Sequence, residues 1–365
     1  KHIEWDAEAA EKGGYEHFMM KEIHEQPKAV ADTLNSVLKN DAIDLTEVGL
    51  TDADIEHISQ IYIVACGSAY HVGMAAQYVM EDLARIPVRV ELASEFRYRR
   101  PILDKNALAI IVSQSGETAD SLAALREAKE HGVRTLGIVN VVGSSIAREA
   151  DNVFYTLAGP EISVATTKAY STQLIAAYTL AIQFAKVRGE ITDEQYAAYI
   201  KELQIILDKI RKILEDKERI QWFAAKQANA KDVFFIGRGI DYAICLEGSL
   251  KMKEISYIHS EAYAAGELKH GTIALIEDGT PVLALLSDPV LANHTRGNIQ
   301  EVAARGAKVL TIAEENVAKE GDDIVLNNVH PYLSPISMVV PTQLIAYFAT
   351  LHRGLDVDKP RNLAK

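Results

Sequence analysis

The stretch Ser-Gln-Ser-Gly-Glu-Thr at residues 113–118 places three hydroxyl side chains around a glycine, directly after an apolar run and before a segment of helical composition. Backbone N–H groups at a helix N-terminus favour an anion, and Ser113, Ser115 and Thr118 can add hydroxyl donors. Gly116 would let the backbone approach a ligand closely. The stretch therefore predicts a phosphate site. The plainer alternative is that Ser115 or Thr118 caps the helix.

A second group of residues could move protons. Lys251 and Glu254 are three residues apart in an expected helix, so they share one of its faces. The other positions of that helix are apolar or small, which favours burial. A buried carboxylate beside a lysine can act as a general base, whereas an exposed pair would be a surface ion pair only. His270, in the loop that we expect to follow, could donate a proton, although a lone histidine is more often structural.

The elements that must position these residues alternate between short apolar strands and helices, which is typical of a parallel α/β sheet. In such sheets, ligands bind beyond the carboxyl ends of the strands. Three loops at strand ends carry suitable side chains: 65–70, 113–118 and 162–170. The expected strands are 61–65, 87–92, 108–112, 134–139 and 152–156, followed by a second set at 232–236, 281–286, 308–312 and 323–326.

The two sets of strands look like copies of one another, at offsets of 170 to 174 residues. The pentapeptide Thr-Gln-Leu-Ile-Ala occurs at both 172–176 and 342–346. The pairs Gly67/Glu95 and Gly239/Glu267 have equal spacing, as do Ser113/Gly132 and Ser287/Gly306. Because Ser-Asp-Pro-Val-Leu-Ala at 287–292 lacks most of the hydroxyl donors, we expect the second copy to have lost its phosphate site.

This repeat predicts two homologous α/β domains. The expected boundaries are an N-terminal helical arm at 1–51, a first domain at 52–190, a connecting amphipathic helix at 191–221, a second domain at 222–356 and a C-terminal segment at 357–365. We expect the helix of the arm to break near Pro27 and to keep its charges in solvent.

Composition excludes several classes of protein. The 365 residues carry a net charge of −13, which disfavours non-specific binding to nucleic acid or to an anionic membrane. The two cysteines, Cys66 and Cys245, suit neither a disulfide framework nor a metal site. We see no apolar run of the ~18 residues that a membrane span needs and no signal peptide, so we expect a cytoplasmic protein.

Long motifs of the chain resemble the isomerase part of the glucosamine-6-phosphate synthase family, also called glutamine–fructose-6-phosphate aminotransferase. They are ACGSAYHVGMAAQY, ASEFRYR, SQSGETADSLAALREAK, LEGSLKMKEISYIHSEAYAAGELKHG and the terminal DVDKPRNLAK. The resemblance covers essentially the whole chain. It implies two tandem sugar-isomerase (SIS) domains, each a five-stranded parallel sheet flanked by helices, in agreement with the repeat.

The resemblance also implies roles for individual residues. The phosphate contacts would be Ser68, Ser113, Gln114, Ser115 and Thr118. The other substrate contacts would be Cys66, Gly67, Val164, Ala165, Thr166 and Ala364. Glu254 would move a proton between C1 and C2 with help from Lys251, and His270, supplied by a partner subunit, would open the sugar ring. Lys365 would form a Schiff base with the open-chain ketose.

The implied reaction converts fructose 6-phosphate and ammonia into glucosamine 6-phosphate, and glucose 6-phosphate is a further expected ligand. It needs no metal and no organic cofactor. The implied assembly is a homodimer. Family enzymes also carry an N-terminal glutaminase domain, which these residues lack, so we expect no glutamine hydrolysis. Departures from the family pattern are Ala69 where a second hydroxyl is frequent, Thr166 where serine is common, and an end at Lys365.

Two other functions fit the same pattern. A phosphosugar-sensing regulatory module would need the phosphate loop but no base, and the presence of Glu254, Lys251, His270 and Lys365 together disfavours it. A simple ketose–aldose phosphate isomerase would need no imine-forming lysine, and the terminal Pro-Arg-Asn-Leu-Ala-Lys disfavours that.

Overall fold

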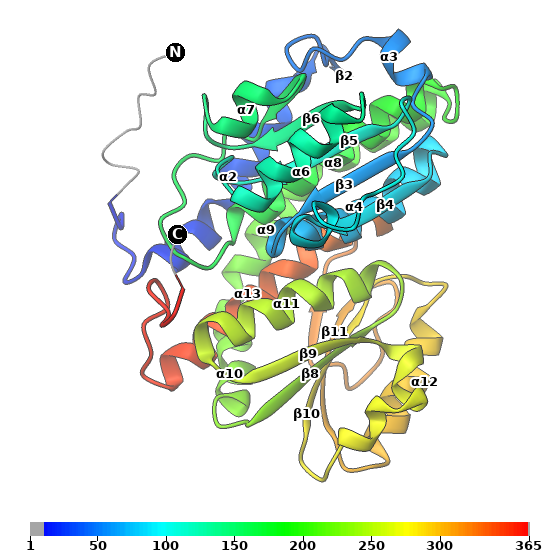
Figure 1. Ribbon diagram of the computed structural model, residues 1–365. Helices are drawn as coiled ribbons and strands as arrows, with labels where there is room; N and C mark the ends of the chain where they lie inside the picture. The colour runs from blue at the N-terminus through cyan, green and yellow to red at the C-terminus, as the bar shows by residue number, and fades with distance from the viewer. Residues whose placement is uncertain (1–10, 364–365) are drawn as a thin grey trace. The chain divides into compact units, whose positions relative to one another are not determined.

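The computed structural model describes residues 11–363, which divide into two compact units (Figure 1). The first unit contains residues 25–161 and 168–207, and the second contains 12–24, 162–167 and 208–363. The short segment 162–167, which the sequence assigns to the first copy, thus lies in the second unit.

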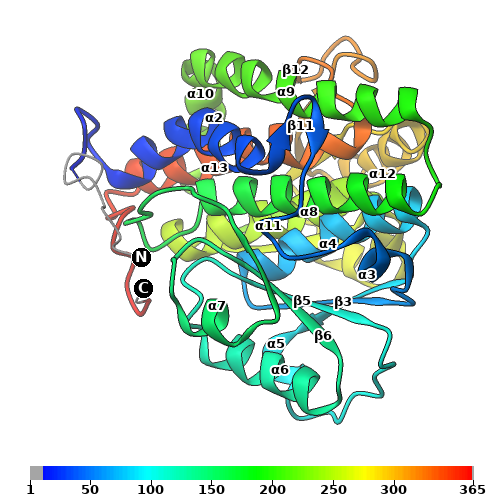
Figure 2. The same cartoon turned by 90° about the horizontal axis from the view of Figure 1, so that it is seen from above.

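The first unit is built on a five-stranded, all-parallel sheet in the order β4-β3-β5-β6-β7. The strands are β3 Ile61–Ala65, β4 Val88–Leu92, β5 Leu108–Ser113, β6 Arg134–Val139 and β7 Asn152–Tyr155. All residues of β3 and β5 are buried, which explains their unbroken apolar sequences. Figure 2 shows helices α4 (Ser68–Ala84) and α8 (Lys168–Val187) on one face of the sheet, and α5 (Ala93–Phe96), α6 (Ala119–Glu130) and α7 (Ser145–Glu149) on the other.

The second unit repeats this sheet, again all parallel, in the order β9-β8-β10-β11-β12. Its strands are β8 Asp232–Gly237, β9 His259–Ala264, β10 Pro281–Leu286, β11 Lys308–Glu314 and β12 Ile324–Leu326. Its helices are α10 Lys217–Gln227, α11 Ile240–Ser256, η1 Ala265–His270, η2 Thr272–Leu275, α12 Ala292–Ala303, η3 Pro331–Leu333 and α13 Ser334–His352. The fold class predicted from the sequence, two tandem five-stranded parallel sheets with flanking helices, is confirmed.

The repeat extends to backbone angles. Helices α4 and α11 both contain 17 residues and both follow a glycine in the same left-handed conformation: Gly67 has φ 57°, ψ −133° and Gly239 has φ 56°, ψ −129°. Both helices also end at a left-handed residue, Arg85 and Tyr257. Equivalent helices in the two units therefore begin in the same geometry.

In the described part of the chain, five further elements lie outside the two five-stranded sheets and the helices named above. They are α2 Phe18–Val37, the hairpin β1 Leu38–Lys39 and β2 Ala42–Ile43, α3 Asp52–Glu56, and α9 Asp193–Glu215. Helix α9 ends just before Asp216, and α10 begins after it, so the expected connecting helix is two helices.

Three expectations about the elements are wrong. The stretch 259–264, expected to be a loop, forms β9. This edge strand is partly exposed along most of its length, so it lacks the apolar run of a central strand. The loop expected around His270 is the 3₁₀-helix η1. Helix α2 continues through Pro27 and buries several polar residues instead of exposing them, including Glu22 and Gln26.

Helix α13 is long and apolar enough for a membrane span, which the sequence was expected not to contain. The segment Pro331–His352 meets the length and composition of such a span, but its apolar window is entirely buried. It packs against α10 and α11, which identifies it as a core helix of the second unit.

Candidate active site

The first unit places its predicted phosphate loop at the point where the strand order reverses. Strand β3 has β4 on one side and β5 on the other, so the connections after β3 and β5 leave in opposite directions. In open parallel sheets this opening between neighbouring loops is where ligands bind. The loop after β3 contains Cys66 and Gly67, and the loop after β5 contains residues 114–118. The structure thus brings the two predicted loops together.

The hydroxyl groups of the phosphate loop face one another. Ser113 Oγ lies 3.0 Å from Thr118 Oγ1 and accepts a 3.1 Å hydrogen bond from the Gly116 N–H. Thr118 is the N-cap of α6, but its side chain makes no capping hydrogen bond. The simple capping alternative is therefore not what the structure shows. The first N–H groups of α6 have no intrahelical acceptor and remain suited to an anion.

Gly116 is required at its position for two reasons. Its φ of +65° is a left-handed conformation, and a Cβ would lie 2.0 Å from Ser144 Oγ. The carboxylate of Glu117, the next residue, accepts a 2.7 Å hydrogen bond from the Ser145 N–H. These bonds to Ser145 lower the pKa of Glu117. The one acid of the loop is therefore engaged elsewhere and leaves the donors to a ligand.

The neighbouring loop supplies a half-buried thiol and a buried hydroxyl. Burial raises the pKa of Cys66, and the thiol interacts with Ser121 in the first turn of α6. A raised pKa keeps the thiol protonated at neutral pH, which suits a contact and not a nucleophile. Ser68 is the first residue of α4 and is 9% exposed. The side chains of Gln114, Ser115 and Thr118 are partly exposed, as a binding loop requires.

The second unit contains a buried row of charges on α11. Lys251 is fully buried, and its Nζ lies 2.5 Å from Glu254 Oε2 and 3.5 Å from Glu247 Oε1. Glu247 is also fully buried, whereas 23% of the Glu254 side chain is exposed. Lys251 and Glu254 are therefore not a surface ion pair. Glu247 was missed by sequence reasoning, although its position four residues before Lys251 signals a shared helix face.

The predicted sugar-contact segment 162–167 is fixed by hydrogen bonds of its backbone. The Glu22 carboxylate accepts the N–H groups of Ile162 and Ser163, at 2.5 and 3.1 Å. The Val164 N–H donates to the carbonyl of Asp358, at 3.1 Å. Ala165 is buried, and Val164 and Thr166 are partly exposed. Burial of Glu22 on α2, which sequence reasoning missed, thus has a clear purpose in holding this segment.

The C-terminal segment is anchored at two places. The Asp358 carboxylate accepts the first N–H groups of α2, from Phe18 and Met19, both at 2.8 Å. The Arg361 N–H donates to the Tyr257 hydroxyl at the end of α11, at 2.7 Å, and its guanidinium covers the same ring at 4.2 Å. Ala364 and Lys365 lie outside the described residues. His270 is exposed at the end of η1.

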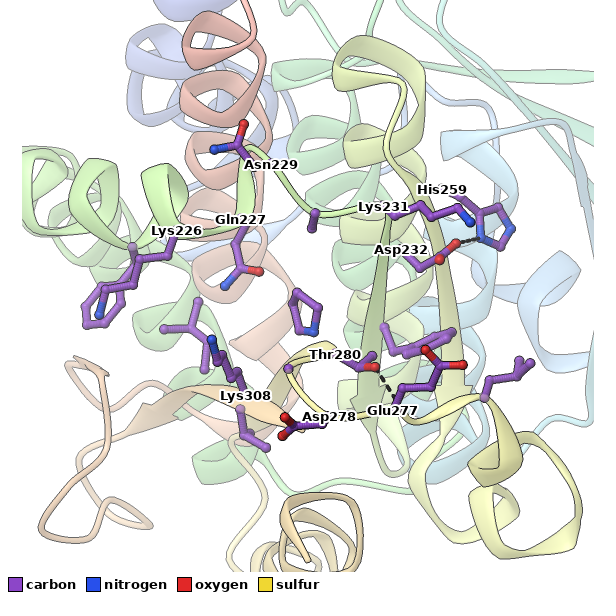
Figure 3. Close-up of a pocket in the computed structure, with 18 of the residues that line it drawn as sticks. Lys226, Gln227, Asn229, Lys231, Asp232, His259, Glu277, Asp278, Thr280 and Lys308 are labelled. Carbon is purple, nitrogen blue, oxygen red and sulfur yellow. Dashed lines mark hydrogen bonds and ion pairs between the residues drawn. The ribbon is translucent and has the colours of Figure 1, made fainter. Parts of the chain in front are cut away.

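The second unit also has a hollow away from these residues. A cavity of about 930 Å³ is lined by Asp232, Pro281 and Lys308, the first residues of β8, β10 and β11 (Figure 3). It therefore opens at the amino ends of the strands, whereas the loops that bind ligands in this architecture follow the carboxyl ends. None of the predicted site residues lines it. No group of side chains within residues 11–363 has the composition of a metal site.

Comparison with known proteins gives consistent matches. The SIS domain family matches residues 54–183 and 227–353. The glutamine–fructose-6-phosphate aminotransferase (isomerizing) of Caldanaerobacter subterraneus subsp. tengcongensis is 55% identical over the whole chain, and that of Clostridium tetani is 54% identical. The chain spans 60% and 61% of the lengths of these two relatives. A solved structure, the C-terminal domain of glucosamine-fructose-6-phosphate aminotransferase from Francisella tularensis, is 40% identical with a TM-score of 0.92, covering 96% of this chain and 100% of that one.

Proposed function

The chain belongs to the SIS family, as an isomerase domain of the glutamine–fructose-6-phosphate aminotransferase type, and we propose that it converts fructose 6-phosphate and ammonia into glucosamine 6-phosphate. The observation that carries the proposal is the buried contact between Lys251 and Glu254, at 2.5 Å, on a helix that begins at a strand end. A sensor would have no use for a carboxylate held against a fully buried lysine. An enzyme that moves a proton between two carbons needs one.

The phosphate group of the substrate would bind the first unit. The hydroxyls of Ser113, Ser115 and Thr118 and the N–H groups at the start of α6 would hold it, together with Gln114 and Ser68. This end of the sugar does not react, so its binding energy can orient the carbons that do. Cys66, Gly67 and residues 164–166 would contact the sugar itself.

Proton transfer would use α11. The Glu254 carboxylate would take a proton from one carbon and return it to the next, because it is the member of the charged row that solvent and substrate can reach. Lys251 would hold the Glu254 carboxylate in place through their 2.5 Å contact and help in transfers to the sugar oxygens. Glu247, fully buried on the far side of Lys251, would hold the ammonium group in place.

Imine formation would use Lys365, and Ala364 would contact the substrate beside it. Attack by the lysine on the open-chain ketone would form a C=N bond and release water. Ammonia would then displace the lysine amine from the same carbon, which frees the lysine and leaves the nitrogen that the product keeps. The C=N bond acidifies the adjacent C–H. His270 of one subunit would open the sugar ring bound to its partner subunit. The exposure of His270 supports a contact with another subunit. We therefore expect a homodimer in the cytoplasm, with glucosamine 6-phosphate and glucose 6-phosphate as further ligands. Neither a metal nor an organic cofactor takes part in these steps.

The test is the variant Glu254→Gln, assayed with fructose 6-phosphate and ammonia. Turnover should fall by about 10²–10⁴-fold, the usual contribution of a general base, while the affinity for the sugar phosphate changes little. Glu320→Gln, at an exposed position of the second unit, serves as the matched control and should behave like the wild type. Unchanged turnover in Glu254→Gln would favour a phosphosugar sensor. Formation of glucose 6-phosphate alone, with ammonia present, would favour a simple isomerase.

A further inference from the structure

The loop of the second unit that replaces the phosphate loop already holds an anion. Asp241, in the first turn of α11, is 1% exposed. Its Oδ2 accepts a 3.0 Å hydrogen bond from the Ser287 N–H, and its Oδ1 accepts a 2.5 Å bond from the Ser287 hydroxyl. The Asp288 N–H is a further donor to the same carboxylate. Backbone and hydroxyl donors at the end of β10 thus converge on one buried carboxylate.

At the position of this carboxylate, the repeat gives the first unit only the methyl group of an alanine. Asp241 is the second residue of α11 and Ala69 the second residue of α4, and both helices follow a glycine with the same backbone angles. The Cβ of each residue therefore leaves its helix in the same direction. Ser287 is the equivalent of Ser113, since each lies at the carboxyl end of the middle strand of its sheet. Only the second unit fills the space between them with a charge.

A carboxylate this deep in the protein must be compensated, because desolvation costs a buried charge several kcal/mol unless donors replace its water. Burial raises the pKa of Asp241 to about 6, and the Ser287 hydroxyl and N–H oppose that rise. The group is therefore ionised at pH 8. Its donors are of the same kind, a serine hydroxyl and backbone N–H groups at a strand end, that the first unit offers to phosphate.

We propose that Asp241 is a built-in anion that occupies, in the second unit, the oxyanion site which the first unit keeps open for a phosphate group. The duplicated site was not merely stripped of its donors. The chain closed it with its own carboxylate, so only one copy can take a phosphorylated ligand. The inference rests on the proposed function in one respect, the binding of phosphate by the loop 113–118.

The first test removes the built-in anion and supplies a free one. Asp241→Ala, at pH 8, should lower the melting temperature, and sodium formate should restore part of the loss when compared with sodium chloride of equal ionic strength. Asp241→Asn leaves no cavity for formate and is the matched control. We expect formate to raise the melting temperature of Asp241→Ala at least twofold more than that of Asp241→Asn. Equal shifts in the two variants would overturn the proposal.

The second test transplants the carboxylate into the first unit and does not require Asp241→Ala to fold. Ala69→Asp should keep the melting temperature within a few degrees of the wild type and weaken the binding of inorganic phosphate at least tenfold. Ala69→Asn, similar in size but neutral, should weaken it less. Equal weakening by both variants, or unchanged binding in Ala69→Asp, would overturn the proposal. If the protein formed no product from fructose 6-phosphate, the proposed function would be wrong. The formate rescue of Asp241→Ala and the phosphate binding of Ala69→Asp would still test the built-in anion.

Discussion

At the scale of single residues, the charged row on α11 has one lysine between two carboxylates. Removing the positive charge leaves Glu247 fully buried beside a second carboxylate, and breaking a buried ion pair in this way costs about 3–5 kcal/mol. We therefore expect Lys251→Met to lower the free energy of unfolding by about that amount. Urea unfolding measures it.

The matched control is Lys253→Met, an exposed lysine on the same helix, which should change stability by less than about 0.5 kcal/mol. The double variant Glu247→Gln/Lys251→Met should recover part of the loss, because it removes one of the two stranded carboxylates. A Lys251→Met protein as stable as Lys253→Met would mean that the row is solvated in solution.

Gly116 offers a prediction with an internal control. Gly116 and Gly132 have similar left-handed backbones, with φ +65° and +73°, but an added Cβ would collide with Ser144 only at Gly116. Gly132→Ala should cost about 1–2 kcal/mol, the ordinary strain of a left-handed alanine. Gly116→Ala should cost more and should also weaken phosphate binding, since the loop must move. Thermal unfolding and phosphate titration of both variants test this, and equal effects would contradict the close approach to Ser144.

At the scale of elements, the end of α11 holds the segment that leads to Lys365. Tyr257→Phe keeps the ring under the Arg361 guanidinium but removes the hydroxyl that accepts the Arg361 N–H. A lost hydrogen bond of this kind is worth about 1 kcal/mol. We expect faster proteolysis of the C-terminal segment and lower turnover, with only a small fall in the unfolding midpoint. Mass spectrometry of timed digests follows the release of the segment.

Tyr263→Phe is a suitable control, because the Tyr263 hydroxyl bonds Glu261 within the same unit and does not contact the C-terminal segment. Its digestion should match that of the wild type. If Tyr257→Phe also digests at the wild-type rate, the anchor is carried by the Asp358 contacts with α2 instead.

The elements show which sequence signals are sufficient. Central strands such as β3 and β5 are buried on both faces, so an unbroken apolar run predicts them well. The edge strand β9 and helix α2 were misread for opposite reasons. β9 has the mixed sequence of a partly exposed strand, and α2 carries buried polar residues whose partners are distant in sequence. Glu22, for example, binds residues 162 and 163.

At the scale of the whole molecule, the repeat was readable because glycines and strand-end serines recur at nearly fixed offsets. The candidate residues on loops followed from it, since the architecture fixes which ends of the strands carry ligands. What the sequence could not predict is which charges are buried. Asp241, Glu247 and Glu314 look like surface acids in the sequence, and all three are at most 1% exposed.

Buried acids give the molecule a definite response to pH. Burial raises the pKa of Glu314 to about 7, helped by the charge of Asp241 and opposed by the Val329 N–H, which donates to the carboxylate, by the nearby Ser334 hydroxyl and by Lys209. The folded state therefore binds a proton on Glu314 more tightly than the unfolded state, whose carboxyl titrates near 4.5. Stability from this group is complete below the unfolded value and is lost as pH rises through the folded one.

Between pH 5.5 and pH 8, the wild type should thus lose on the order of 2 kcal/mol relative to Glu314→Gln, which has no proton to lose. Urea unfolding of both proteins at the two pH values gives the difference directly, and the comparison cancels the titrating groups that do not interact with Glu314. Glu315→Gln, an exposed neighbour, should follow the wild type at both pH values. If wild type and Glu314→Gln respond to pH in parallel, the prediction is wrong and Glu314 has access to water in solution.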